Sequence, residues 1–233
     1  MRFVNPGIDL QSSLAALQIA DAHEEVFVAC GVHPNDALTW NSDTLNELRK
    51  LVRHPKVVAI GEIGLDYYRD RAPKELQKRI LSEQLALAAD AGLPVVIHNR
   101  QATDDILELL TSWHADLVSS GSPLAERAGV LHSFSGDTVA ARKALEIKFM
   151  IGISGPVTYR NADDLRRIIA SLPLSALLIE TDAPFLTPHP HRGERNEPAH
   201  VRWVAEKIAE IHDLPLQVVA EQTNANSQKL FNW

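Results

Sequence analysis

The sequence contains only one cysteine, Cys30, among its 233 residues. An intrachain disulfide therefore cannot form, and the N-terminus has no basic start followed by an apolar run, which is the pattern of a signal peptide. No apolar stretch approaches the roughly 20 residues needed to cross a bilayer. These absences predict a protein of the reducing cytoplasm with no membrane partner.

Positive charge is also in short supply, with 23 Lys and Arg against 30 Asp and Glu and a formal net charge of −7. Proteins that coat long duplex DNA through counterion release usually have basic surfaces, so this balance argues against that class. Aromatic residues make up 6% of the chain and do not interleave with basic ones, so the sequence predicts no base-stacking platform. Nucleic acid remains a candidate substrate if a metal supplies positive charge locally.

Hydrophobic residues account for 45% of the chain, which suits one domain over residues 1–233 with an ample core. Apolar runs of strand length alternate with segments that have an apolar face at helical spacing. Strands are expected at residues 2–8, 26–32, 57–62, 94–98, 129–132, 149–153 and 177–182, and helices near residues 14–20, 42–52, 73–92, 104–113, 140–147, 162–170, 201–211 and 216–230. Ser42 is expected to cap its helix, Pro73 to be the first residue of the next helix, and Gly92 to close that helix.

The strict alternation of about seven strand–helix units predicts an α/β fold of the TIM-type (β/α) barrel class, with the first strand–helix unit absent. A doubly wound open sheet is the alternative. No glycine-rich phosphate loop follows the first strand, as a dinucleotide-binding fold of that kind would require.

Four of the expected strands end in residues that bind divalent metals, namely Glu62, His98, His132 and Asp182. In a barrel such strand ends converge on one face. Two imidazoles with two carboxylates suit zinc, manganese or magnesium, and Glu62 could bridge two ions. Asp182 could orient a bound water or take its proton, although an Asp before Ala-Pro can also simply cap a turn.

Basic residues near these strand ends are candidates for phosphate binding. Arg192 and Arg195 lie in the polar loop 188–198, Arg100 follows His98 by two residues, and His33 ends the second expected strand. Guanidinium groups bind phosphates in a bidentate manner. The alternatives are a solvated turn, an ion pair with a nearby glutamate, or a capped turn before a proline.

Two further residue groups receive structural interpretations. The Gly64-Leu65-Asp66 turn favours a role for Asp66 in holding local backbone or Arg69. His189 and His191 have His-x-His spacing, but they lie in a proline-rich loop where side-chain direction is not fixed by strand alternation, so we do not expect them to bind metal.

Six motifs together resemble the TatD-type metal-dependent deoxyribonucleases of the amidohydrolase-like barrels. They are Gly31-Val32-His33-Pro34, Gly61-Glu62-Ile63-Gly64-Leu65-Asp66, Val96-Ile97-His98-Asn99-Arg100, Leu131-His132-Ser133-Phe134-Ser135-Gly136, Glu180-Thr181-Asp182-Ala183-Pro184 and Arg192-Gly193-Glu194-Arg195-Asn196-Glu197-Pro198. The resemblance implies a barrel, one to three divalent ions, and phosphodiester hydrolysis, typically exonucleolytic on single-stranded DNA or RNA. Glu62, His98, His132 and Asp182 fall on the family's ligand positions.

The sequence departs from this family at its beginning. Family members start with a strand that carries a His-x-His pair of ligands, and this chain starts on what would be the second strand. We interpret the difference as a truncation or a misassigned start, and expect an open sheet edge that lowers stability or promotes self-association. The alternative functions are an ester or amide hydrolase, such as an aminoacyl-tRNA deacylase, and a catalytically impaired binding module.

Overall fold

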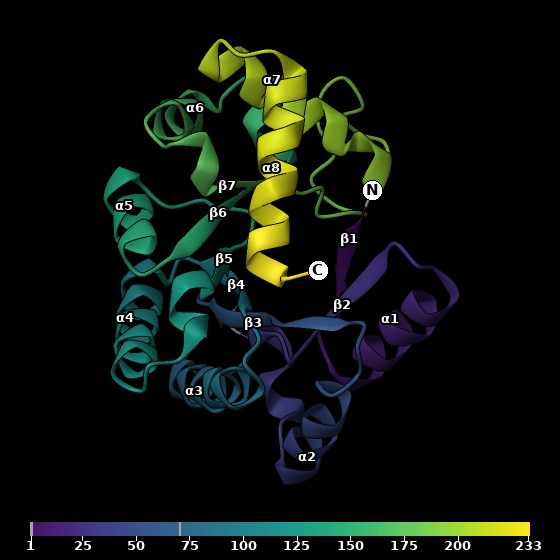
Figure 1. The fold of residues 1–233 in the computed structure, drawn as a ribbon, viewed down its shortest axis with the longest axis vertical. Coiled ribbons are helices and arrows are strands. Elements are labelled where there is room, and N and C mark those ends of the chain that lie inside the picture. Colours follow the sequence, from purple (N-terminus) through teal and green to yellow (C-terminus); the bar gives the residue numbers. More distant parts are fainter. Residues whose placement is uncertain (1, 70) are drawn as a thin grey trace. The chain divides into compact units, whose positions relative to one another are not determined.

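The computed structural model describes residues 2–69 and 71–233, which fold into two compact units. Unit 1 comprises the described residues up to Val130 together with Leu230–Trp233, and unit 2 comprises Leu131–Lys229. Strands and helices alternate along both units, as the sequence predicts (Figure 1). In the described part of the chain, no helix is both long and apolar enough to span a bilayer.

Unit 1 is built on four parallel strands that pair in sequence order, with helices outside them (Figure 1). Pairs such as Phe3↔Val26 and Gly64↔His98 set the register. The elements are β1 (Phe3–Pro6), α1 (Leu10–Ala22), β2 (Val26–Cys30), α2 (Ser42–Leu51), β3 (Val57–Asp66), α3 (Lys74–Ala91), β4 (Val95–Arg100) and α4 (Thr103–Ser119). Strand β5 (Gly129–Leu131) contains the boundary between the units.

Unit 2 contains the parallel pair of β6 (Phe149–Ile153) and β7 (Leu177–Ile179). Its helices are α5 (Thr138–Glu146), α6 (Asp163–Ala170), α7 (Val201–His212) and most of α8 (Leu216–Phe231). Short 3₁₀ helices in the two units cover Pro34–Thr39, Pro123–Arg127, Gly155–Thr158, Leu174–Ala176 and Pro198–His200.

Strands β2, β3 and β6 are mostly buried and apolar, and their side chains form the core of each unit together with residues of the helices. In unit 1 fully buried side chains include Ile60, Ile63, Leu65, Leu81, Ile97, Ile106 and Leu110, and in unit 2 they include Phe149 and Ile151. Cys30 is buried with them, and burial raises the pKa of its thiol to about 12, so this residue is chemically inert.

Several element boundaries differ from the sequence prediction. Asn41 caps α2, because its side-chain oxygen accepts the N–H groups of Asp43 and Thr44, and Ser42 is the first helical residue. Pro73 precedes α3 instead of beginning it, while Gly92 closes that helix in the left-handed region as expected. Strand β3 continues to Asp66, four residues beyond the predicted end at Glu62.

Two features of β3 place Glu62 next to β4. The register between β3 and β4 shifts between Ile60 and Ile63, so Glu62 lies within an irregularity of the strand. Gly64 follows with φ 147°, and a Cβ atom there would lie 1.9 Å from the carbonyl oxygen of His98. Only glycine permits this close approach, which brings the Glu62 segment beside His98.

Candidate functional site

A cluster of two histidines and one glutamate lies in unit 1. His33 follows β2, Glu62 belongs to β3 and His98 belongs to β4. One potential ligand atom from each of the three residues lies within 4.8 Å of the other two. Imidazole nitrogens with a carboxylate form a donor set that suits zinc or manganese, so these residues fit a divalent ion.

His98 lies between two carboxylates. Its Nδ1 atom is 2.8 Å from Oε1 of Glu62, and its Nε2 atom is 3.3 Å from Oδ2 of Asp66. A metal-binding histidine commonly turns one nitrogen to the metal and donates the other N–H to a carboxylate, which fixes the ring. Asp66 is placed to accept the N–H of the His98 ring at Nε2. The Nδ1 atom and Glu62 would then face the metal.

Asp66 also holds the loop that follows β3. Its Oδ1 atom accepts the N–H groups of Tyr68 at 3.0 Å and Arg69 at 2.9 Å, while Oδ2 accepts an amide hydrogen of Asn35 at 3.2 Å. Burial by itself would raise the pKa of Asp66, but the Arg69 N–H, His98, Asn35 and the Tyr68 N–H hold that pKa below its ordinary value. The structural role predicted for Asp66 is confirmed, and the contact with His98 adds to it.

His33 faces Glu62 with a nitrogen that carries a proton. Its Nδ1 atom accepts the Asn35 N–H at 3.1 Å, so the proton of the neutral ring is on Nε2. That Nε2 atom is 3.7 Å from Oε1 of Glu62. In this tautomer the Nε2–H group of His33 is a hydrogen-bond donor on the side of Glu62.

A second set of a histidine with two carboxylates lies in unit 2. The Nδ1 atom of His132 is 3.0 Å from Oε2 of Glu180, and its Nε2 atom is 3.3 Å from Oδ1 of Asp182. The sequence analysis missed Glu180. The two-residue spacing of positions 180 and 182 is the one signal that the sequence offers, but both residues lie beyond the end of β7 at Ile179, so strand alternation does not place them.

The backbone around this second set adopts conformations that are uncommon for residues other than glycine. Ser133 has φ 43° and Asp182 has φ 59°, both in the left-handed region. The backbone N–H of Ser133 donates to Oε1 of Glu180. Backbone conformations of this kind are costly and occur often at functional sites, where the surrounding structure maintains them.

Asn196 is the residue that maintains the Asp182 segment. It is buried, and its Nδ2 atom donates to the carbonyl oxygens of Thr181 at 2.7 Å and Phe185 at 2.6 Å. Its Oδ1 atom lies 3.1 Å from Nδ1 of His200 and accepts the N–H of Glu197 at 2.9 Å. The amide therefore joins the backbone on both sides of Asp182.

Two of the predicted phosphate-binding arginines stack on tyrosine rings. In unit 1 the Arg100 guanidinium lies 4.0 Å from the Tyr68 ring centroid, and no ion pair of Arg100 is present among the described residues. In unit 2 the Arg192 guanidinium lies 4.0 Å from the Tyr159 ring centroid and donates to the Tyr159 hydroxyl at 2.7 Å. Stacking pre-orients a guanidinium group while leaving N–H groups at its edge.

The Asp182 carboxylate acts electrostatically on this second pair. Burial raises the pKa of Tyr159, the nearby Arg192 opposes the rise, and Asp182 adds to it. Arg195 is exposed and lines a cavity with Ala183, Pro184 and Asn196. The basic residues predicted from loop 188–198 thus lie close in unit 2 to the segment that carries Asp182.

The His-x-His pair of the same loop has other partners. His191 stacks on His200, with ring centroids 4.4 Å apart, and its Nδ1 atom is 3.1 Å from Oε2 of Glu194. The His189 ring packs edge-on against Tyr159. Both rings thus pack against aromatic side chains of unit 2.

The structure thus places the predicted residues in two sets. Glu62 and His98 lie together in unit 1, where His33 and Asp66 join them, and His132 and Asp182 lie together in unit 2, where Glu180 joins them. Tyr159 and Asn196 also belong to the surroundings of the second set, and the sequence did not identify either of them as a candidate.

Comparisons with known proteins give a consistent result. The sequence profile described as TatD related DNase matches residues 1–232. A Bacillus subtilis protein named as an uncharacterised metal-dependent hydrolase, YabD, is 40% identical over 230 residues, which are 99% of this chain and 87% of that protein. A protein of Enterobacter lignolyticus named 3'-5' ssDNA/RNA exonuclease TatD is 36% identical over 230 residues, which are 97% of this chain and 85% of its length.

Among solved structures, a TatD homologue of Escherichia coli, YJJV, matches with a TM-score of 0.90 and 32% identity, covering 100% of this chain and 86% of that one. A TatD-family hydrolase of Entamoeba histolytica matches with a TM-score of 0.82 and 24% identity, covering 98% and 83%. The likeness to the Escherichia coli structure confirms the predicted α/β fold class of TIM-barrel type.

Proposed function

The chain belongs to the TatD-related DNase family of metal-dependent hydrolases, and we propose that it hydrolyses phosphodiester bonds of DNA or RNA, exonucleolytically and on single strands. The observation that carries the proposal is the repeated arrangement of a histidine between two carboxylates, His98 with Glu62 and Asp66, and His132 with Glu180 and Asp182. The relative named as a single-strand exonuclease supports the choice of nucleic acid as the substrate.

In this proposal Glu62, His98, His132 and Asp182 are ligands of divalent ions, with magnesium, manganese or zinc as candidates. Carboxylate oxygens suit all three ions, and imidazole nitrogens favour zinc and manganese. When bound, such an ion lowers the pKa of a water and stabilises negative charge on phosphate oxygens. Asp66 fixes the His98 ring in the required tautomer.

The remaining residues bind substrate and handle the proton. Asp182, whose carboxylate is about one-third exposed, orients the attacking water and accepts its proton, and Glu62 holds the opposite side of His98. Arg100, Arg192 and Arg195 bind phosphate groups of the strand, and the Nε2–H of His33 donates to a phosphate oxygen. Because the chain as a whole has a net charge of −7, these few cations determine where the strand can bind.

The test is cleavage of an end-labelled single-stranded oligonucleotide with magnesium or manganese, compared with the same reaction in chelator. We expect metal-dependent shortening from one end, lost in Asp182→Ala and Glu62→Ala. Asp164→Ala is the matched control, because this exposed aspartate of α6 pairs only with Arg167 among the described ion pairs, and it should keep full activity.

Two outcomes would contradict the proposal. One is cleavage that persists in chelator or in Asp182→Ala. The other is hydrolysis of an aminoacyl ester by a chain that leaves the oligonucleotide intact, which would assign the site to ester hydrolysis.

A further inference from the structure

Phe185 is an exposed aromatic residue in the turn that follows Asp182. Its side chain is 70% exposed, the highest value among the exposed large hydrophobic residues of the described chain. The chain has six phenylalanines, and others such as Phe134 and Phe149 are buried in the core. Folding therefore gains little from burial of the Phe185 ring, and the ring is accessible to a ligand.

The backbone of Phe185 is held on both sides. Its N–H donates to the carbonyl oxygen of Asp182 at 2.8 Å, and its carbonyl oxygen accepts from Nδ2 of Asn196 at 2.6 Å. The carbonyl oxygen of the preceding Pro184 accepts the Asn196 N–H at 3.2 Å. The ring is thus exposed to solvent, while its backbone is fixed relative to the Asp182 segment. Because this backbone is already ordered, binding a ligand would cost little conformational entropy of the turn.

The same turn borders a cavity that offers a cation. The cavity has a volume of about 370 Å³ and is lined by Ala183, Pro184, Arg195, Asn196, Glu197 and Pro198. The Phe185 carbonyl bonds to Asn196, the sequence neighbour of Arg195, so an exposed aromatic residue and an exposed cation come from adjoining backbone. A nucleotide unit presents a flat base and an anionic phosphate, which such a pair of residues can bind. The sequence pattern concealed this pairing, because Phe185 and Arg195 are ten residues apart.

We propose that Phe185 is a stacking platform for one unpaired nucleobase next to the phosphate that is cleaved, with Arg195 on the phosphate of the same nucleotide. The inference rests on the proposed function, because it takes Asp182 to mark the site of cleavage. An unpaired base has a free face for the ring, whereas a base within a duplex is already stacked on both sides. The platform is therefore a source of selectivity for single strands.

The test measures oligonucleotide binding in chelator, so that cleavage does not interfere. The ligands are a fluorescein-labelled pentanucleotide and a set of the same pentanucleotides with one abasic position each. Phe185→Ala should weaken binding of the intact ligand by roughly 5- to 100-fold, and Phe185→Tyr should restore it, because base–aromatic stacking contributes in that range. Val139→Ala, which truncates a 60% exposed residue of α5, is the matched control and should bind as the wild type does.

The decisive result is non-additivity. At one abasic position, removal of the base should weaken binding to the wild type as much as Phe185→Ala weakens binding of the intact ligand. The same abasic ligand should bind Phe185→Ala as tightly as the intact ligand does. Additive losses at every position, unchanged binding in Phe185→Ala, or no binding by the wild type would each overturn the inference. Unchanged binding would instead assign the ring to a protein partner.

A parallel cleavage assay with manganese separates the two proposals. Cleavage without non-additivity contradicts the proposed stacking platform and supports the proposed nuclease activity. Non-additivity without cleavage supports the base-binding site and contradicts the nuclease activity.

Discussion

The Nδ1 atom of His98 lies 2.8 Å from Oε1 of Glu62, and the neighbouring nitrogen of the same ring lies 3.3 Å from Asp66. The ring is therefore held in one orientation by carboxylates on opposite edges. His132 has the same relationship to Glu180 and Asp182. In each set one carboxylate can bind an ion as a ligand while the other fixes the orientation of the ring. The two sets therefore have comparable chemistry.

Loss of the Asp66 carboxylate should weaken metal binding more than it weakens the fold. Asp66→Asn keeps an oxygen for the loop N–H groups but no longer accepts strongly from Nε2–H of His98. We expect manganese affinity to fall by about 10- to 100-fold, as for other residues that orient a ligand. Isothermal titration with manganese measures this, and an affinity equal to that of the wild type would contradict the arrangement.

Two buried asparagines of unit 2 allow a matched comparison. Asn196 bonds the carbonyls of Thr181 and Phe185, while Asn226 bonds those of Leu174 and Leu177, at the other end of the β7 segment. Alanine at either position removes two hydrogen bonds from the side chain to backbone carbonyls and should cost about 1–3 kcal/mol of unfolding free energy.

Only Asn196→Ala should also affect activity. It releases the Asp182 segment from its φ of 59°, so we expect cleavage to fall by about tenfold or more, whereas Asn226→Ala should cleave normally at temperatures where it is folded. Urea unfolding and the oligonucleotide assay measure the two effects. Equal losses of activity would mean that Asn196 acts through stability alone.

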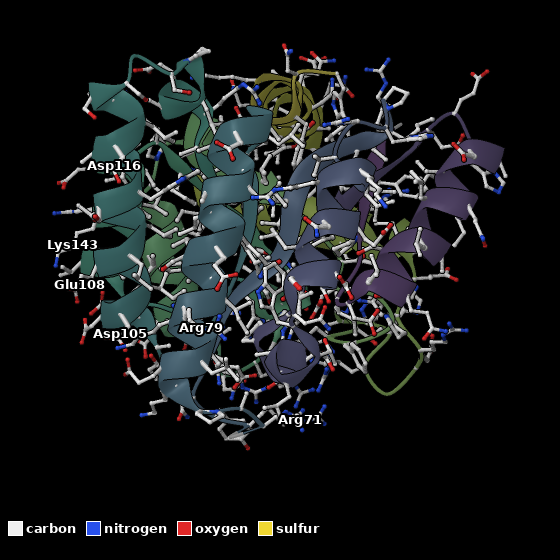
Figure 2. The ribbon with its side chains drawn as sticks, turned by 90° about the horizontal axis from the view of Figure 1, so that it is seen from below. Arg71, Arg79, Asp105, Glu108, Asp116 and Lys143 are labelled. Carbon is white, nitrogen blue, oxygen red and sulfur yellow. The ribbon has the colours of Figure 1, made fainter. Side chains whose placement is uncertain are left out.

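Acidic pH should selectively remove the contribution of Asp105. Figure 2 labels this residue of α4. Its carboxylate contacts Lys78 and Tyr67, and the hydrogen bonds from these two side chains, together with the charges of Lys78 and Lys74, hold its pKa below the ordinary value. A lowered pKa means that the stabilisation is present above the unfolded-state pKa of about 3.9 and is lost as pH falls through the lower folded-state value.

Asp105→Asn should therefore lower the urea midpoint at pH 7, and the difference from the wild type should shrink toward zero below about pH 3. Urea titrations at a series of pH values provide the measurement. A difference that stays constant down to the lowest pH would show that the charge of Asp105 does not stabilise the fold.

Exposed apolar side chains on the first strand–helix segment should cause self-association. Leu14 and Ile19 of α1 are 45% and 48% exposed, and Ile8 before it is 45% exposed. We expect the apparent mass to rise with concentration in sedimentation velocity runs and to fall toward the monomer in Leu14→Glu/Ile19→Glu. Val118→Glu, at an exposed site on α4, is the control and should associate as the wild type does. A monodisperse wild-type monomer would refute the prediction.

The sequence predicted the elements of the fold and the main metal-binding candidates because apolar periodicity marks strands and helices directly. The runs before Glu62, His98, His132 and Asp182 are short and apolar, as buried strands require. Boundaries were less accurate, because caps depend on single hydrogen bonds. Asn41 and Ser42 are both good capping residues, and only the structure shows which of them accepts the helix N–H groups.

The residues that support the candidates were harder to predict, since their roles depend on contacts between distant segments. Asn196 reaches Thr181 across 15 positions, and Tyr159 stacks under Arg192 across 33. Glu180 depends on the unusual backbone of Ser133, which no periodicity indicates.

Gly152 sets a limit on how this protein can change over time. A Cβ atom at that position would lie 2.7 Å from Oε2 of Glu180, the atom that faces His132. Any larger residue at position 152 must therefore displace that carboxylate. The two positions are thus coupled although they are 28 residues apart. A side chain gained at position 152 should therefore turn the Glu180 carboxylate away from His132, even in a lineage that keeps the glutamate.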